Sequence, residues 1–284
     1  MKRTRKIKII LCSVILVTFF FAAFYNGLVV RKYIVHSDKL KTEECFRIVL
    51  LADLHNHIHG EDQTKLISLI QKQKPDMIAL AGDIADDEAS LKGTERLLEG
   101  LQGLTPTYYV TGNHEYWSND VENIKNTIRK YDVTILEHNY EPMLVNNTSI
   151  IVGGVDDPEI IKYEKPGMDW RGEMETAFAP LQDHPNFKIL LSHRPELIET
   201  YEESNFDLVL SGHAHGGQAR IPFILNGLLA PNQGWFPKYA GGAYDLDTFT
   251  LIVSRGLSYN PRLPRIFNPP EVVVVDVEIG RAHV

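Results

Sequence analysis

The sequence has little cysteine. Only Cys12 and Cys45 occur among 284 residues, which is too few for a disulfide framework or a zinc site built from thiolates, and two cysteines leave the redox compartment open. The composition, with 44% hydrophobic and 23% charged residues, also excludes a disordered or collagen-like chain. The chain therefore has to be stabilised by an ordinary hydrophobic core.

Positive charge is also scarce outside the N-terminus. The formal net charge is −8, but the first 32 residues hold seven Lys or Arg and no acid, which leaves 22 cations against 37 anions in the remainder. An acidic body repels polyanions, so we expect no nonspecific nucleic-acid binding. Any phosphate that this body handles has to be held by local positive charge, and bound metal would supply it.

One long apolar run is present, over residues 9–30. As a helix it would span about 33 Å, enough for the hydrocarbon core of a bilayer. More basic residues precede it than follow it, which places the N-terminus in the cytoplasm and the bulk of the chain outside. A cleaved signal peptide is the alternative, but the run is long and 21–24 (FAAF) offers no small-x-small cleavage site. We predict a cytoplasmic basic tail over 1–8, a membrane anchor over 9–30 and a connector over 31–45.

The last six residues, 279–284 (IGRAHV), match one translation of a common sequencing-adapter read. We therefore interpret them as a non-native tail and keep His283 out of any functional hypothesis. The segment between connector and tail, 46–278, contains no internal repeat or second boundary and is predicted to form one domain.

Short apolar runs alternate with amphipathic stretches through this domain. The runs 46–51, 77–80 and 108–110 are typical of buried strands, and the first two precede helical spacing of Leu and Ile. Asn146-Asn147 between two apolar runs predicts a hairpin over 143–152. Further strands are expected at 187–191, 208–210, 248–253 and 272–277. Alternation of this kind indicates an α/β fold.

Five polar clusters each follow one of these strands. They are Asp53-Leu54-His55, Gly82-Asp83, Gly112-Asn113-His114-Glu115, Ser192-His193 and Gly212-His213-Ala214-His215. Taken singly, each could be a helix cap, a turn or a structural histidine. Ligands gather beyond the carboxyl ends of strands in α/β sheets, however, and oxygen and imidazole donors suit Mn, Fe or Zn. Together the clusters predict a divalent metal site.

This ordered set resembles the calcineurin-like metallophosphoesterase family. The resemblance implies a four-layer αββα sandwich that holds two divalent metal ions, Mn, Fe or Zn, at the strand ends. By motif position, the ligands of one metal would be Asp53, His55 and His215. The ligands of the other would be Asn113, His193 and His213. Asp83 would bridge both metals, and His114 would contact the phosphate and protonate the leaving oxygen.

A narrower resemblance is to the bacterial branch with YkuE- and YaeI-type phosphodiesterases, many of them membrane-attached. It rests on 212–218 (GHAHGGQ), 254–257 (SRGL) and Pro264-Arg265. Ala214 and Ser258 depart from the pattern of that branch, but neither is a ligand position. Arg255 and Arg265 could bind a second phosphate or a substrate headgroup, or could be structural arginines.

The combined expectation is a membrane-anchored dimetal phosphoric-ester hydrolase with its catalytic domain on the extracytoplasmic side of the cell membrane. It would be a phosphodiesterase or pyrophosphatase that uses a metal-bridging hydroxide. A lipid-linked or nucleotide-sugar phosphate ester is the expected substrate, although related UDP-diacylglucosamine pyrophosphatases would act on the cytoplasmic face. The alternatives are a phosphomonoesterase or protein phosphatase on the same site, and a noncatalytic surface binding module.

Overall fold

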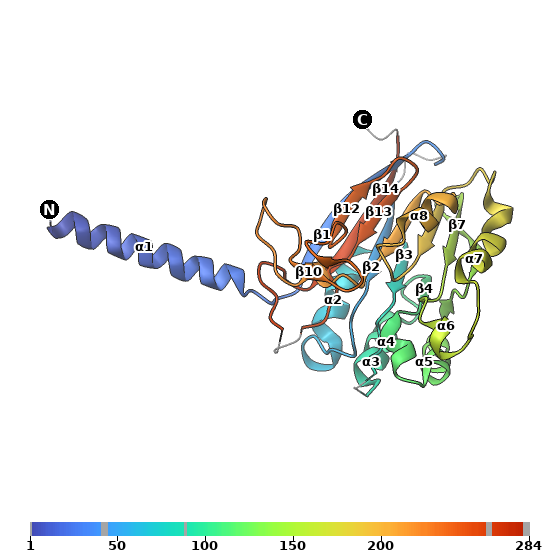
Figure 1. The fold of residues 1–284 in the computed structure, drawn as a ribbon, viewed down its shortest axis with the longest axis horizontal. Helices are drawn as coiled ribbons and strands as arrows, with labels where there is room; N and C mark the ends of the chain where they lie inside the picture. Colours follow the sequence, from blue (N-terminus) through green and yellow to red (C-terminus); the bar gives the residue numbers. More distant parts are fainter. Residues whose placement is uncertain (1, 41–44, 88–89, 260–262, 281–284) are drawn as a thin grey trace.

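Two six-stranded sheets make up the body of the molecule in the computed structural model, which describes residues 2–40, 45–87, 90–259 and 263–280 (Figure 1). The sheets are stacked face to face, and helices cover their outer faces. The α/β fold predicted from the alternating pattern is confirmed.

The first sheet has the strand order β1-β14-β2-β3-β4-β5. Strands β2 to β5 run parallel, whereas β14 is antiparallel to β2 and parallel to β1, so the sheet is mixed. The bounds are β1 Val29–Ser37, β2 Phe46–Leu51, β3 Met77–Ala81, β4 Thr107–Val110, β5 Val133–Ile135 and β14 Glu271–Ile279.

The second sheet has the order β12-β13-β9-β8-β7-β6. Its four central strands are parallel, and both edge strands are antiparallel to their neighbours. The bounds are β6 Asn139–Val145, β7 Thr148–Gly154, β8 Lys188–Leu191, β9 Leu208–Ser211, β12 Gly242–Asp245 and β13 Thr250–Val253. A separate ribbon pairs β10 (Leu229–Ala230) with β11 (Gly234–Trp235).

Three buried apolar clusters define the layers. One lies between the sheets and includes Leu50 and Ile189. A second packs the outer face of the first sheet against α2 (Thr64–Gln73), α3 (Lys92–Leu101) and α5 (Val121–Arg129). The third packs the outer face of the second sheet against α6 (Ile160–Tyr163), α7 (Trp170–Phe178) and α8 (Ile198–Glu203). The layer order is therefore helices, sheet, sheet, helices, as the family resemblance implies.

The hairpin predicted around Asn146 and Asn147 is confirmed. Strands β6 and β7 pair antiparallel with Val145 opposite Thr148, and the two asparagines between them have φ of 47° and 62°. Left-handed φ at both central positions is what a two-residue hairpin turn requires, and asparagine tolerates it better than most residues.

The N-terminal segment differs from the sequence prediction. Helix α1 runs from Lys2 to Ala23 rather than over 9–30, and residues 31–37 of the predicted connector belong to strand β1, which pairs with β14 along its whole length. Burial alternates along the second half of β1, where Val35 and Ser37 are buried and Ile34 and His36 are exposed, as expected for a strand with one covered face. The described part of α1 stands away from the body (Figure 1). It is long and apolar enough to be a membrane span or a signal sequence.

The C-terminal end of the domain is also ordered further than expected. Ile279, assigned to the non-native tail, is the last residue of β14, and the Gly280 N–H donates to the Ser37 carbonyl at 3.1 Å. Residues 281–284, like 41–44 of the connector, lie outside the described residues.

Candidate active site

Strands from both sheets end at the same place. Each predicted cluster follows the carboxyl end of its strand: β2, β3 and β4 in the first sheet, and β8 and β9 in the second. Helix α4 (Asn113–Trp117) begins directly after β4 and carries the third cluster. Five of the predicted ligands leave their strands with left-handed φ between 47° and 65°: Asp53, His55, Asp83, His213 and His215. Such backbone conformations cost free energy and concentrate at functional sites.

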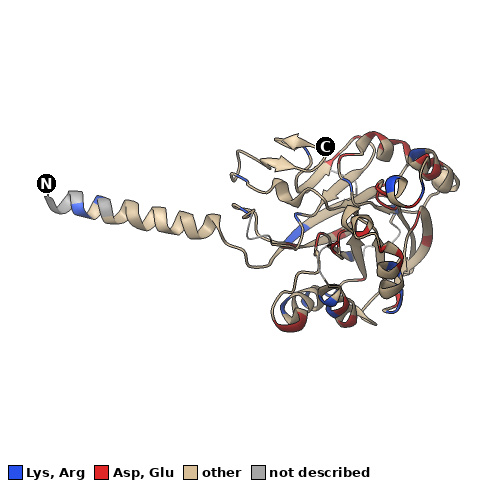
Figure 2. Cartoon of the chain, turned by 60° about the horizontal axis from the view of Figure 1, so that its bottom comes forward, with Lys and Arg blue, Asp and Glu red and all other residues tan. Residues whose placement is uncertain are grey.

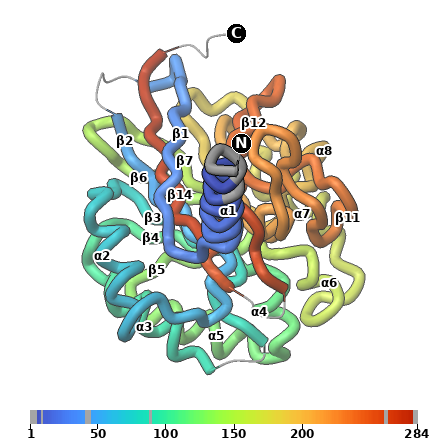
Figure 3. The backbone as a smooth tube through the Cα atoms, turned by 90° about the vertical axis from the view of Figure 1, so that its left-hand side faces the viewer, coloured from blue at the N-terminus to red at the C-terminus, as the bar shows by residue number. Residues whose placement is uncertain are grey.

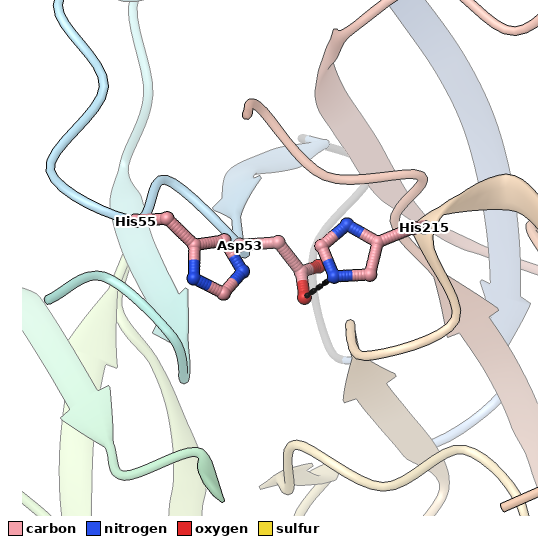
Figure 4. Close-up of side chains that lie close together, drawn as sticks. All are labelled: Asp53, His55 and His215. Carbon is pink, nitrogen blue, oxygen red and sulfur yellow. Dashed lines mark ion pairs between the residues drawn. The ribbon is translucent and has the colours of Figure 1, made fainter. Parts of the chain in front are cut away.

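Asp53, His55 and His215 form the first group of possible metal donors. One ligand atom from each lies within 4.8 Å of the other two. Figure 4 shows the Asp53 carboxylate between the two imidazole rings, and His215 Nε2 is 3.5 Å from Asp53 Oδ1. These are the side chains that the sequence assigned to one metal.

Asp83, His193 and His213 form the second group, again within 4.8 Å. His193 Nε2 lies 3.1 Å from Asp83 Oδ2, and the same oxygen is 3.7 Å from His55 Nε2 in the first group. Asp83 therefore stands between the two groups, where the sequence prediction placed a bridging carboxylate.

Three buried acceptor atoms at this place have no hydrogen-bond partner within the described part of the chain: Asp83 Oδ2, His55 Nε2 and Asn113 Oδ1. Leaving a buried polar atom unpaired costs about 1–3 kcal/mol. Cation coordination satisfies all three, because carboxylate, imidazole and amide groups are the donors that Mn, Fe and Zn accept. The residues present thus fit a two-metal site.

The buried carboxylate of Asp83 places positive charge on a neighbouring imidazole. Burial opposes ionisation of Asp83, but the imidazoles of His193 and His55 hold its pKa well below the usual range. Burial lowers the pKa of His193, and Asp83 outweighs this effect and raises it to about 10. Burial also lowers the pKa values of His213 and His215, which keeps these rings neutral and able to coordinate.

Gly112 shows how closely this site is packed. A Cβ at Gly112 would lie 2.2 Å from Asp83 Oδ1, so no other residue fits there without displacing the carboxylate. Next to it, the His114 N–H donates to the same oxygen at 2.9 Å. Glu115 accepts from the backbone N–H groups of Gly112 and Asp83, which fixes the two loops against each other. These contacts give Glu115 a supporting role in the site.

His114 lies beside the first group, on the solvent side. Its ring centroid is 4.4 Å from that of His55, and its Nδ1 is 2.7 Å from Asp87 Oδ1. This contact occupies Nδ1 of His114 and leaves its Nε2 available to a ligand. Both rings line an open pocket of about 330 Å³ together with His57, Asp86, His215, Gln218, Ser258, Tyr259, Leu263 and Arg265.

Sequence reasoning missed several residues that orient the donors. Asp86 Oδ2 is 3.0 Å from His55 Nδ1, and Asn232 Oδ1 is 2.7 Å from His213 Nε2. Arg194 donates to Asn232 at 2.6 Å and holds Asp157 through two bonds. The position of Asp86, three residues after Asp83, offered a weak signal. Nothing marked Asn232 as a site residue; it lies in the turn between β10 and β11.

Removing the Asp86 carboxylate tests its orienting role. We expect Asp86→Ala to weaken metal binding by about 10–100-fold, because a carboxylate on the distal nitrogen fixes the ring orientation and raises its basicity. Isothermal titration with Mn²⁺ would measure this, with Asp62→Asn, at an exposed position, as control. Unchanged affinity in a folded Asp86→Ala protein would show that His55 needs no such support.

The family model described as calcineurin-like phosphoesterase matches residues 46–217, more than half of the chain. The chain belongs to the calcineurin-like metallophosphoesterase family. Curated relatives include an uncharacterized metallophosphoesterase of Campylobacter jejuni, 31% identical over 96% of this chain and 69% of that protein. YkuE of Bacillus subtilis, also an uncharacterized metallophosphoesterase, is 28% identical over 81% of this chain and 78% of its own length. The predicted likeness to the YkuE branch is thus confirmed.

Two further comparisons concern the membrane and the fold. A bovine protein named "Transmembrane protein with metallophosphoesterase domain" is 33% identical over 75% of this chain and 48% of its own length. The solved NAD nucleotidase NadN of Haemophilus influenzae has a TM-score of 0.50 at 16% identity, covering 84% of this chain and 45% of that chain. This second likeness concerns the fold alone.

Proposed function

We propose that the chain is a membrane-anchored dimetal phosphodiesterase or pyrophosphatase whose catalytic domain lies on the extracytoplasmic side. The observation that carries the proposal is the position of Asp83. Its Oδ2 lies 3.1 Å from His193 Nε2 and 3.7 Å from His55 Nε2, so one carboxylate faces both donor groups. Asp53, His55 and His215 would hold one cation, Asn113, His193 and His213 the other, and Asp83 both.

Different residues of the chain would take different roles in the reaction. When bound, two divalent cations supply an activated hydroxide and neutralise charge on the phosphate. Asp83 and its imidazole neighbours fix the spacing of the two groups. Asp87 would hold the His114 ring so that Nε2 can donate a proton to the leaving oxygen. Water enters freely because the pocket is open.

A diester is the favoured substrate class because of the charge around the pocket. Asp86 lines it, and Asp87 lies beside His114, whereas Arg265 is the cation in the lining. Two guanidinium nitrogens of Arg265 already donate to the carbonyls of Ser258 and Arg255. An ester with one negative charge is repelled less by this acidic rim than a dianionic monoester.

Helix α1 would anchor the chain in the membrane. Its apolar side chains, including Leu16 and Phe21, are exposed along the helix, and only a short segment separates Ala23 from β1. The active domain would therefore sit directly at the bilayer, where lipid-linked phosphate esters are found.

A substrate pair tests the reaction class. The full chain, supplied with Mn²⁺, is expected to hydrolyse bis-p-nitrophenyl phosphate at least about tenfold faster, in kcat/KM, than p-nitrophenyl phosphate. Release of p-nitrophenolate is the readout, and the metal-free protein is the control. A preference for the monoester would refute the diesterase proposal and favour a phosphatase on the same residues.

A further inference from the structure

A second pocket, of about 470 Å³, lies beside the point where α1 joins the body. It is lined by Arg31 from β1, Arg220 from the loop after η3 (His215–Gly217) and Arg255 from the segment after β13. The rest of the lining comes from the apolar loop 221–225, Asn226 and Phe267. None of these residues lines the active-site pocket. We call it the arginine pocket.

The arginine pocket carries excess positive charge. Arg255 Nε is 3.5 Å from Glu271 Oε2, and Arg31 Nε is 3.9 Å from the same oxygen. Arg220 instead donates to neutral oxygens, the Gly216 carbonyl and the Asn226 side chain. Burial together with the charge of Arg255 lowers the pKa of Arg220 to about 10. Among the described residues, the carboxylate of Glu271 thus faces the charge of three guanidinium groups, in a domain that is otherwise acidic.

The apolar loop 221–225 exposes large side chains to solvent. Ile221 is 48% exposed, Ile224 is 82% exposed, and Phe223 is fully exposed at the tip with a left-handed φ of 66°. Hydrogen bonds between Ile221 and Leu225 close the loop. A left-handed conformation is uncommon for a bulky residue, and the loop uses it to point an aromatic ring into solvent. A contiguous exposed apolar surface of this kind marks an interaction site.

Contacts of Ile266 and Phe267 hold the apolar loop 221–225 beside α1. The Phe267 ring packs on Phe19 with centroids 5.0 Å apart, and the Phe267 N–H donates to the Ala23 carbonyl at 2.7 Å. The Arg220 N–H donates to the Ile266 carbonyl at 2.9 Å. Figure 2 shows Lys and Arg positions on the strand and loops nearest α1, and Figure 3, viewed along α1, shows β1 and β14 beside its base.

We propose that the arginine pocket and the apolar loop 221–225 bind an anionic phospholipid of the bilayer that α1 enters. The lipid phosphate would accept hydrogen bonds from Arg31, Arg220 and Arg255, while Phe223 and Ile224 enter the acyl region. This inference rests on the proposed function for the anchoring by α1. Guanidinium groups match phosphate geometry, and an anionic leaflet attracts basic clusters.

Lipid binding there would also orient the active site. Gln218 lines the active-site pocket, and Arg220 lines the arginine pocket two residues later. On the other side, Arg255 precedes Gly256, where an added Cβ would lie 2.7 Å from Asp53 Cβ. Two short segments thus connect the pockets, so a bound headgroup would fix which side of the domain faces the membrane.

Hydrogen–deuterium exchange of the full chain in lipid nanodiscs tests this proposal. One set of nanodiscs contains phosphatidylcholine alone, and the other contains added phosphatidylglycerol. With phosphatidylglycerol, exchange over 219–226 is expected to slow by about tenfold. Arg31→Gln with Arg220→Gln should remove that effect, and Phe223→Ser should reduce it. The control pair Arg96→Gln with Arg129→Gln, on α3 and α5, should keep it.

Equal exchange in the two lipids, or an effect that survives Arg31→Gln with Arg220→Gln, would overturn the proposal. Slowing by inorganic phosphate in phosphatidylcholine nanodiscs would also overturn it, because the site would then bind free anions. Turnover of bis-p-nitrophenyl phosphate is measured on the same wild-type sample. Turnover without lipid-dependent slowing contradicts only the lipid site, whereas slowing without turnover supports the lipid site and contradicts the proposed function.

Discussion

Replacing Asp83 by asparagine is expected to lower phosphodiester turnover by about 10³-fold or more. The substitution keeps the shape of the side chain but removes the charge that lies between the two donor groups. A 10³-fold loss in rate corresponds to a loss of several kcal/mol of transition-state stabilisation, because about 1.4 kcal/mol changes a rate tenfold. The contacts of Asp83 with His193 and His55 would persist as weaker neutral contacts.

Two measurements make the Asp83→Asn result interpretable. Elemental analysis of the purified protein should show fewer than two metal ions per chain, and circular dichroism should show an intact fold. Asp183→Asn is a matched control, because Asp183 is exposed in the turn that precedes β8, at the opposite end of that strand from the site. Wild-type turnover or full metal content in Asp83→Asn would contradict the two-metal assignment.

His114→Ala is expected to lower kcat by about 10²–10⁴-fold while metal content stays unchanged. The reason is geometric. Asp87 binds Nδ1 of His114 at 2.7 Å, and the ring lies at the pocket edge, where Nε2 can reach a leaving oxygen. The loss should be larger for an alkyl leaving group than for p-nitrophenolate, because a poor leaving group depends more on protonation.

Leaving-group dependence separates proton donation from a structural role for His114. Comparing bis-p-nitrophenyl phosphate, which loses p-nitrophenolate, with dialkyl diesters, which lose an alkoxide and are followed by analysis of the monoester product, gives the required series. His36→Ala, on the exposed side of β1, is the matched control. An equal loss across the series would show that His114 positions the substrate without donating a proton.

The positions of the predicted ligands could be foreseen because strand ends are local signals. Asp53 and Asp83 follow fully buried apolar runs, and parallel strands bring such ends to one edge of a sheet. The separation of the donors into two groups came from the family resemblance, and the geometry around Asp83 agrees with it. The assignment of each residue as a ligand stays a prediction.

Features that depend on tertiary contacts could not be foreseen. Strand β1 follows an apolar helix and carries basic residues, so its alternation was hidden until β14 supplied a partner. Asn232 reaches His213 from a loop with no pattern of its own. The turn that exposes Phe223 is closed by local hydrogen bonds between Ile221 and Leu225, but its place beside α1 depends on the bond from Arg220 to Ile266.

The place of β14 between β1 and β2 has a consequence for biogenesis. The first sheet cannot close until residues 271–279 have been synthesised, because β14 fills the gap between two earlier strands. Until then, both neighbours present unpaired backbone edges, which invite wrong pairing between nascent chains. Nascent chains in this unfinished state are therefore expected to depend on factors that shield strand edges.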